Sequence, residues 1–247
     1  EHNYFGYRES VITFFKQDMA CAVDYDGKLL LEEKGRLATS PNGNGGWFAS
    51  MLKAGLQDDI HKRGIKWMNV FAVDNVLQRI ADPVFVGATI SGGYKCGSKV
   101  VRKVEPQEKM GLMCLQEGKP SIVEYYEMSK EMAEAKADDG SLLYKYGVIL
   151  NYLFAVESLE EIVKNKMMVH VVEKKIPFIK EDGTLVSPTE PNGYKFELLV
   201  LDMIHLMPNN LAFEVKRENE FAPIKNLHGT DSVDSARELL KGCGVEL

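Results

Sequence analysis

The sequence predicts an α/β fold in which part of the sheet is antiparallel. Segments with the apolar periodicity of helices alternate with short, strand-like segments along the whole chain. Residues 28–73 contain a strand, a helix and a strand in succession, and we expect a right-handed crossover between the two strands. Asp26-Gly27 and Asp182-Gly183 each lie at a hairpin position, which requires antiparallel neighbours.

Composition limits the class of protein and its partners. With 247 residues, 45% hydrophobic and 27% charged, the chain can form one large domain, or one domain with a small appendage. A net charge of −6 disfavours a broad nucleic-acid surface. No apolar run approaches the roughly 18 residues of a membrane span. Four scattered cysteines predict no zinc site and a reducing compartment, so we expect a cytoplasmic protein.

In the first third of the chain, the apolar pattern predicts short strands, a hairpin and an amphipathic helix. The apolar run 11–15 predicts an interior strand, so close to residue 1 that we expect a longer protein. Residues 28–31 form the second strand of the first hairpin. Apolar side chains recur every three or four residues over 47–60, which predicts a helix ending at Arg63-Gly64. A buried strand at 67–73 follows.

The rest of the chain alternates between the two kinds of element. Asp82-Pro83 is expected to end a short helix, and residues 158–161 have the pattern of a capping box. We expect strands at 98–104, 112–115, 121–125, 151–156 and 211–215, and helices at 76–81, 129–137, 196–207 and 235–241.

A glycine-rich turn opens the first helix. Gly43, Gly45 and Gly46 surround Asn44, and glycine lets backbone N–H groups approach a ligand closely. The same residues also suit an ordinary turn with left-handed backbone. No Lys-Ser or Lys-Thr follows the glycines, so the turn is not a P-loop.

Asp74 comes directly after the strand at 67–73. Open α/β sheets bind ligands at the carboxyl ends of their strands, and a carboxylate there can hold Mg²⁺ beside a phosphate. The alternative is that Asp74 or Asn75 caps the helix expected at 76–81. Together, the glycine turn and Asp74 indicate a phosphate-bearing ligand with a divalent cation.

Four other polar residues can each either bind a ligand or have an ordinary structural or solvent-facing role. Lys225 follows a proline turn and can bind phosphate or face solvent. Lys195 and Glu197 suit either a ligand site or a helix start, and Glu124 can accept sugar hydroxyls or face water. No arrangement resembles a Ser/His/Asp or Cys/His relay.

Ten motifs in order carry a family resemblance over essentially the whole chain. The chain resembles the UDP-N-acetylglucosamine pyrophosphorylase branch of the UDP-sugar pyrophosphorylases. The motifs are Pro41-Asn42-Gly43-Asn44-Gly45-Gly46, Arg63-Gly64-Ile65, Val73-Asp74-Asn75-Val76-Leu77, Ala81-Asp82-Pro83-Val84-Phe85-Val86-Gly87, Lys99-Val100-Val101-Arg102-Lys103, Pro106-Gln107-Glu108-Lys109-Met110-Gly111, Val123-Glu124-Tyr125, Lys174-Lys175-Ile176-Pro177, Pro191-Asn192-Gly193-Tyr194-Lys195-Phe196-Glu197 and Phe221-Ala222-Pro223-Ile224-Lys225-Asn226.

The resemblance implies a Rossmann-like mixed sheet of the GT-A-like type and a uridylyltransferase that joins UTP and a sugar 1-phosphate with Mg²⁺. It implies a central catalytic domain over 1–207 and the start of a C-terminal region over 208–247. It also implies the roles of single residues: Gln17 at uracil, Gly43, Asn44, Gly45 and Lys195 at the substrate, Gly111 and Glu124 at the sugar, Asp74 at the metal, and Lys225 at the α-phosphate.

Three departures from the family pattern leave alternatives open. The N-terminal Leu-x-Gly-Gly-x-Gly-Thr-Arg loop and a catalytic lysine segment are absent, so we expect the 247 residues alone to be inactive or very weak. Val148 replaces a sugar-binding asparagine, and Leu199 and Leu201 replace phenylalanines of the N-acetyl pocket. The expected sugar is N-acetylglucosamine 1-phosphate. The alternatives are a UDP-glucose or UDP-galactose type enzyme, an inactive nucleotide-sugar binding homologue, and a metal-dependent glycosyltransferase.

Overall fold

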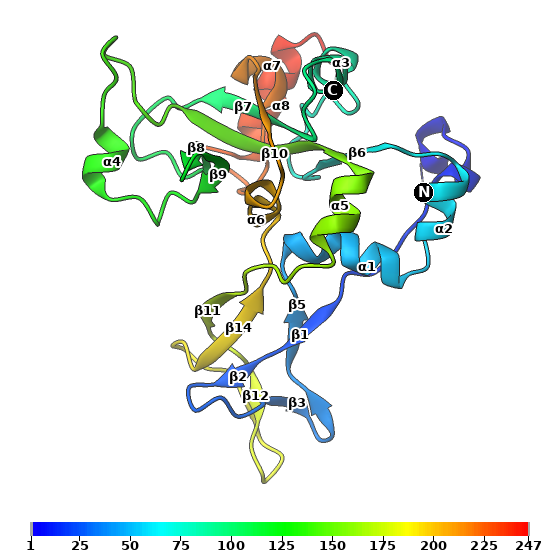
Figure 1. Ribbon diagram of the computed structural model, residues 1–247. Helices are drawn as coiled ribbons and strands as arrows, with labels where there is room; N and C mark the ends of the chain where they lie inside the picture. The colour runs from blue at the N-terminus through cyan, green and yellow to red at the C-terminus, as the bar shows by residue number, and fades with distance from the viewer. Residues whose placement is uncertain (1, 247) are drawn as a thin grey trace. The chain divides into compact units, whose positions relative to one another are not determined.

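The computed structural model describes residues 2–246, which form two compact units (Figure 1). Unit 1 contains residues 2–64 and 165–200, and unit 2 contains residues 65–164 and 201–246. The domain boundary expected between residues 207 and 208 stays a prediction.

Unit 2 is built on a six-stranded mixed sheet, as the sequence predicts. The strand order is β15-β7-β10-β8-β9, and β6 also pairs with β10. Only the β15–β7 pair is parallel. Figure 1 shows β7 and β10 side by side at the centre of this unit. The strands are β6 (Trp67–Phe71), β7 (Cys96–Arg102), β8 (Leu112–Gln116), β9 (Lys119–Val123), β10 (Tyr146–Ala155) and β15 (Leu211–Glu214).

Strands β6 and β8 lie along the same edge of β10, one after the other. β6 ends with Phe71 opposite Asn151, and β8 begins with Leu112 opposite Gly147. Between these pairs β10 has a bulge, and Leu150 has a left-handed backbone with φ of 50°. The carboxyl end of β6 and the amino end of β8 therefore meet at the bulge.

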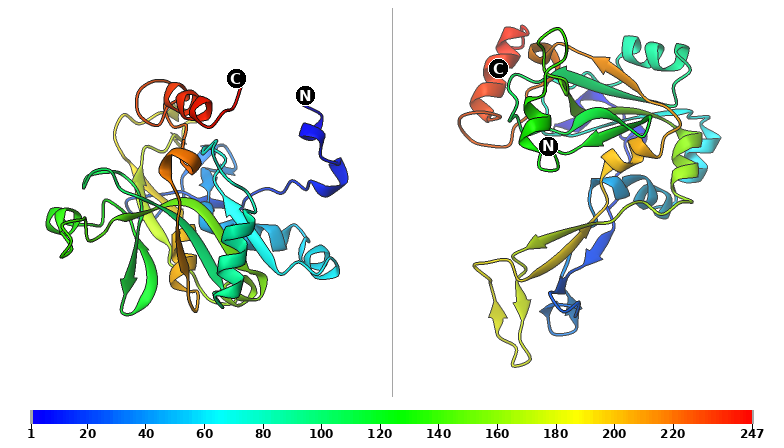
Figure 2. Two further views of the ribbon diagram at one scale, coloured as in Figure 1. Left: turned by 90° about the horizontal axis from the view of Figure 1, so that it is seen from above. Right: turned by 60° about the vertical axis from the view of Figure 1, so that its left-hand side comes forward.

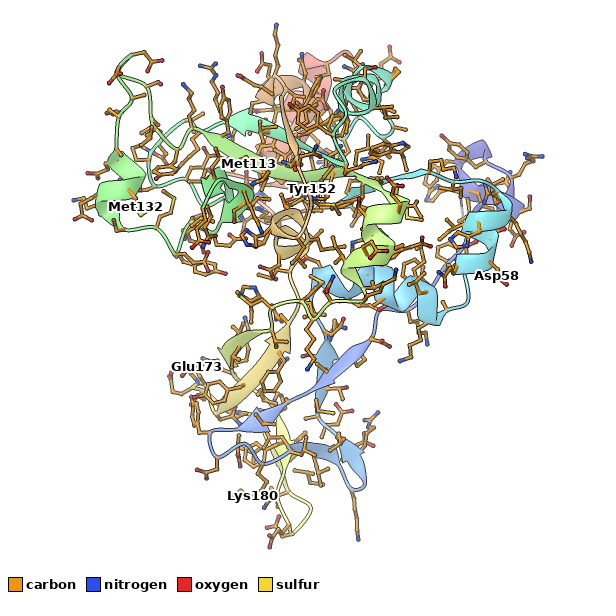
Figure 3. All side chains as sticks on the ribbon, viewed as in Figure 1. Asp58, Met113, Met132, Tyr152, Glu173 and Lys180 are labelled. Carbon is orange, nitrogen blue, oxygen red and sulfur yellow. The ribbon has the colours of Figure 1, made fainter. Side chains whose placement is uncertain are left out.

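Helices complete unit 2. A Cβ on Gly97 of β7 would lie 2.5 Å from Thr89 Oγ1 and 2.7 Å from the ring of Phe85, so helix α3 packs directly on the sheet at this glycine. Tyr152 and Phe154 of β10 are buried, and Figure 3 shows Tyr152 inside this sheet. The helices are α3 (Pro83–Ser91), α4 (Lys130–Glu134), α5 (Val156–Ile162), α7 (Arg217–Glu220) and α8 (Val233–Gly242); α6 (Val200–His205) begins at the last residue of unit 1.

Unit 1 consists of small antiparallel sheets around a small apolar core of Ala22, Leu30, Ala38 and Ile176. Figure 2 shows the β12–β13 hairpin extending from the β11–β14 pair, and Lys180 projects from this hairpin in Figure 3. The sheets have the strand orders β11-β14-β2, β1-β5, β12-β13 and β3-β4. The elements are η1 (Asn3–Gly6), η2 (Glu9–Val11), β1 (Met19–Cys21), β2 (Val23–Asp24), β3 (Leu31–Glu33), β4 (Arg36–Leu37), β5 (Thr39–Pro41), η3 (Asn44–Gly46), α1 (Trp47–Lys53), α2 (Gln57–Lys62), β11 (His170–Lys174), β12 (Phe178–Ile179), β13 (Leu185–Val186) and β14 (Gly193–Glu197).

Three expectations in the first third of the chain were wrong. Residues 11–15 form no strand, and Phe14 is 83% exposed. The single helix over 47–60 is two helices, because Gly55 takes a φ of 81° between α1 and α2. The expected crossover is also absent, since β6 pairs antiparallel with β10, and β3, which contains Leu31 of the expected first strand, pairs with β4.

Three helix boundaries of the later chain also differ. Asp82 begins α3 rather than ending a helix, because its side chain accepts a hydrogen bond from the Val84 N–H at 3.1 Å and Pro83 suits the first helical turn. Ser158 lies inside α5, which begins at Val156, so it is no cap. Residues 196–197 belong to β14, and the helix expected from residue 196 begins at Val200.

The two Asp-Gly turns and most of the remaining strands were predicted correctly. Both Asp-Gly turns form, and strands β7, β8, β9, β10 and β15 overlap the predicted segments, although β10 already begins at Tyr146. Of the strand expected at 28–31, only Leu31 belongs to a strand, β3. All four cysteines are free thiols. Within residues 2–246, no helix is long and apolar enough to cross a membrane.

Candidate functional site

Asp74 and Lys225 lie on two neighbouring segments of unit 2. The Asp74 carbonyl oxygen accepts a hydrogen bond from the Ile224 N–H at 2.9 Å, and Asn75 and Pro223 form an isolated β-bridge. Lys225 is the next residue along the chain. The structure thus brings together two candidate residues that are about 150 positions apart in the sequence.

Asn75 joins these two segments through its side chain. Its amide Nδ2 donates to the Glu220 carbonyl oxygen at 2.8 Å, and its Oδ1 accepts from the Ala222 N–H at 2.8 Å. Asn75 is only 4% exposed. No helix begins at Val76, so neither Asp74 nor Asn75 is a helix cap, and the alternative interpretation of this motif was wrong.

The side chains of Asp74 and Lys225 are available to a ligand. The half-buried Asp74 carboxylate forms no hydrogen bond or ion pair with residues 2–246. Lys225 is 54% exposed and lies 3.9 Å from the Asp231 carboxylate, a loose pair in solvent. The described part of the chain holds no group of three acidic, histidine or cysteine side chains fit for a metal. A single free carboxylate still suits Mg²⁺, which keeps several waters and takes phosphate oxygens as further ligands.

Gly111, Glu124 and Val148 also come together in unit 2. A Cβ on Gly111 would lie 3.3 Å from a Val148 methyl and 3.7 Å from Glu124 Oε1. The Val148 N–H donates to the Gly111 carbonyl at 2.9 Å, just before the bulge of β10. Two residues farther along, the Leu150 carbonyl accepts from the Ala72 N–H at 3.1 Å. The segment leading to Asp74 and the Gly111 group therefore meet at the same stretch of β10.

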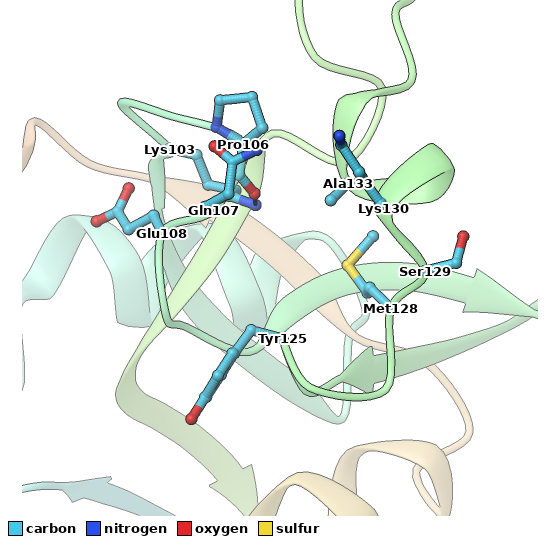
Figure 4. A pocket seen from close by; sticks show the side chains of 9 residues that line it. All are labelled: Lys103, Pro106, Gln107, Glu108, Tyr125, Met128, Ser129, Lys130 and Ala133. Carbon is cyan, nitrogen blue, oxygen red and sulfur yellow. Dashed lines mark hydrogen bonds between the residues drawn. The ribbon is translucent and has the colours of Figure 1, made fainter.

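A cavity of about 290 Å³ lies next to this group (Figure 4). Lys103 and Gln107 lie on one side of it and Met128 and Lys130 on the other, with Tyr125 directly after Glu124. The Lys103 ammonium donates to the Pro106 carbonyl at 2.7 Å. Burial lowers the pKa of Lys103.

In unit 1 the glycine turn contacts the chain segment that follows β14. Gly43 has φ of 86°, and a Cβ on it would lie 2.2 Å from the Leu198 carbonyl oxygen. A Cβ on Gly45 would lie 2.6 Å from the Leu199 carbonyl carbon. The Gly45 N–H donates to Leu198 O at 2.7 Å. Close packing within the protein explains these glycines, and their contact with a ligand stays a prediction.

The other candidate residues of unit 1 also have partners within the protein. Asn44 Oδ1 accepts from the Val200 N–H at 2.9 Å, where α6 begins. Gln17 Nε2 donates to Asn42 Oδ1 at 3.1 Å and to the Gly43 carbonyl. Lys195 is half-buried in the middle of β14, opposite Val172. The roles of all three toward a ligand stay predictions.

A buried charged cluster was missed by the sequence reasoning. Lys99 of β7 is completely buried and pairs with Asp82 and Glu220. Its one sequence signal is that Lys99 directly precedes Val100 and Val101 within the predicted strand. Burial raises the pKa of Asp82, but the hydrogen bonds from Lys99 and from the Val84 N–H outweigh it, so the pKa lies below its usual value.

Comparisons with known proteins agree with the motif series. A sequence profile described as UTP–glucose-1-phosphate uridylyltransferase matches residues 2–237. The chain is 41% identical over 245 residues to human UDP-N-acetylhexosamine pyrophosphorylase-like protein 1, covering 97% of this chain and 48% of that protein. It is 40% identical over 246 residues to UDP-N-acetylglucosamine pyrophosphorylase of Saccharomyces cerevisiae, covering 96% and 52%.

A solved structure has the same fold. The crystal structure of a putative UDP-N-acetylglucosamine pyrophosphorylase from Entamoeba histolytica superposes with a TM-score of 0.87 at 30% identity, covering 96% of this chain and 60% of that chain. The mixed α/β fold is therefore similar to that of UDP-sugar pyrophosphorylases. The chain spans about half the length of the curated relatives it matches.

Proposed function

The chain belongs to the UTP–glucose-1-phosphate uridylyltransferase family, and on that premise we propose that the whole protein joins UTP and N-acetylglucosamine 1-phosphate to UDP-N-acetylglucosamine and pyrophosphate. The names of the relatives from human and yeast support this nucleotidyltransferase activity. The observation that carries the proposal is the backbone pairing of the two segments, because the Asp74 carbonyl accepts from the Ile224 N–H, one residue before Lys225.

The proposed reaction is an in-line attack of the sugar phosphate oxygen on the α-phosphorus of UTP. Such a transfer depends on positioning and charge neutralisation more than on a general base. Asp74 holds Mg²⁺, which when bound neutralises the phosphate oxygens. Lys225 donates to the α-phosphate and stabilises the charge that grows there. Pyrophosphate leaves with the electron pair of the bond that breaks.

The proposed fold type is the Rossmann-like, GT-A-like one, with the nucleotide at the carboxyl end of β6. Support comes from the position of Asp74, three residues beyond Phe71, the last residue of this strand. For Gln17, Gly43, Asn44, Gly45 and Lys195 of unit 1, contact with uracil or with the rest of the substrate stays a prediction from the family resemblance. We keep the cytoplasm as the proposed location, since the four free thiols agree with a reducing compartment.

The sugar is proposed to bind Gly111 and Glu124. The proximity of the two residues supports this, since a Cβ on Gly111 would lie 3.7 Å from Glu124 Oε1. Packing within the protein explains the glycine itself, because the same Cβ would lie 2.9 Å from an Ile122 methyl. Val148 borders the same place, and its side chain can form no hydrogen bond with a sugar.

Replacing Val148 should change the choice of sugar. We expect Val148→Asn to raise kcat/KM for N-acetylglucosamine 1-phosphate about tenfold relative to glucose 1-phosphate, since one hydrogen bond is gained. Steady-state kinetics of the whole protein with both sugars measures this ratio. Val104→Asn, at an exposed valine of the same unit, is the control. An unchanged ratio would remove Val148 from the sugar site.

The activity itself is tested by supplying UTP and individual sugar 1-phosphates and measuring pyrophosphate. Release with N-acetylglucosamine 1-phosphate supports the proposal, and release only with glucose or galactose 1-phosphate identifies the alternative enzyme. Binding of UDP-sugars without any pyrophosphate release would indicate an inactive homologue. Transfer of the sugar from UDP-sugar to an acceptor would indicate a glycosyltransferase.

A further inference from the structure

We propose that Asn75 and the buried cluster of Lys99, Asp82 and Glu220 are positioning residues that hold Asp74 and Lys225 at their working separation. The expected change in kcat rests on the proposed function, and the expected change in hydrogen exchange does not. None of these four residues needs to touch the substrate. They act through the backbone of the two segments that carry Asp74 and Lys225.

Lys99 connects three separate parts of unit 2. Its ammonium donates to the Arg79 carbonyl at 3.4 Å, to Asp82 Oδ2 at 3.1 Å and to Glu220 Oε2. Arg79 belongs to the loop between β6 and α3, which contains Asp74. Asp82 is the N-cap of α3, and Glu220 ends α7 just before the Lys225 segment. All three N–H donors of the lysine therefore have partners.

The cluster continues to the site through Asn75. The carbonyl of Glu220 accepts from Asn75 Nδ2 at 2.8 Å, and Asn75 Oδ1 accepts from Ala222 at 2.8 Å. The next bond in the series joins Asp74 O to the Ile224 N–H at 2.9 Å. A shift of Glu220 would therefore move the Lys225 segment relative to Asp74.

Stability alone is a poor explanation for this cluster. Lys99 is 0% exposed, and removing a charge from water costs about as much free energy as its ion pairs return. Apolar or neutral residues of similar size often stabilise a protein equally well. Directional bonds, however, fix the geometry of three segments in a way that apolar contacts do not.

The test variant replaces the whole cluster by neutral groups of similar size, as Asp82→Asn, Lys99→Met and Glu220→Gln together. Asparagine keeps the helix cap of α3. The control is Arg102→Met together with Glu214→Gln. These substitutions remove an exposed ion pair between β7 and β15, in which Arg102 Nε lies 2.6 Å from Glu214 Oε1. Both variants are compared with wild type by steady-state kinetics, thermal unfolding and amide hydrogen exchange of Ile224.

We expect the cluster variant to lower kcat about 100-fold, because a displacement of about 1 Å has this effect, while the KM for UTP changes little. The Ile224 amide should exchange faster, although the variant stays folded. The control should match wild type in kcat and exchange. Wild-type kcat and wild-type Ile224 exchange in the folded cluster variant would overturn the inference.

A second variant, Asn75→Ala, keeps the charged cluster and removes only the connection. If the cluster variant does not fold, Asn75→Ala alone tests whether these residues position Asp74 and Lys225. A folded Asn75→Ala protein with low kcat and fast Ile224 exchange supports the inference, and wild-type values overturn it. Unfolding of both variants also overturns it, because the residues would then serve stability alone. If wild-type protein releases no pyrophosphate with any sugar, the proposed function fails, and Ile224 exchange still tests the positioning.

Discussion

Asp74→Asn should lower the turnover of the whole protein about 1,000-fold and leave its folding unchanged. The carboxylate is proposed to hold Mg²⁺ at the reacting phosphates, and asparagine has the same shape without the charge. Folding should not need the carboxylate, because it has no hydrogen bond or ion pair with residues 2–246. The backbone carbonyl of residue 74 accepts a hydrogen bond from the Ile224 N–H, and Asp74→Asn keeps this bond.

Pyrophosphate release measures turnover, and thermal unfolding measures folding. The matched control is Asp138→Asn, which neutralises an exposed carboxylate in a loop of the same unit. We expect the control to equal wild type in both measurements. Wild-type turnover of Asp74→Asn would remove this residue from the mechanism. A large fall in thermal stability would show that Asp74 has a structural role instead.

Gly43→Ala should destabilise unit 1 by about 3–5 kcal/mol. The backbone of Gly43, with φ of 86° and ψ of 159°, lies in a region that is essentially restricted to glycine. The added Cβ would also lie 2.2 Å from the Leu198 carbonyl oxygen and 2.6 Å from the Leu198 nitrogen. Because both contacts are with backbone atoms, the β14 side of the turn must move, and the hydrogen bond from Gly45 to Leu198 is strained.

Gly35→Ala is the matched control for this substitution. Gly35 also has a positive φ, 81°, but a Cβ on it would meet no atom within 4 Å. We therefore expect it to cost only about 1–2 kcal/mol, the conformational part. Urea unfolding of both variants gives the two free energies. Equal losses would mean that the contact with Leu198 contributes nothing and that conformation alone selects glycine at position 43.

Local sequence signals predicted the parts of the fold that depend on near neighbours. The Asp26-Gly27 and Asp182-Gly183 turns formed as expected, because backbone preferences within two residues decide them. The strand expected at 98–104 was also identified within two residues, as β7 (Cys96–Arg102), around its central pair of valines. Asp82-Pro83 failed as a helix end, because the same pair equally suits a helix start.

The missed features depend on contacts between distant residues. Nothing near Asn75 in the sequence reveals that its side chain binds the backbone of Glu220 and Ala222. The apolar pattern of β6 is the same for a parallel and an antiparallel neighbour, so its pairing with β10 could not be read from it. For the candidate site, the motif series located Asp74 and Lys225. Only the fold explains why they are neighbours.

The most direct test of the account is a crystal structure of the whole protein with UDP-N-acetylglucosamine and Mg²⁺. The account predicts that an Asp74 carboxylate oxygen binds the metal and that Lys225 Nζ donates to the α-phosphate. A diphosphate bound elsewhere, with both side chains in solvent, would contradict it.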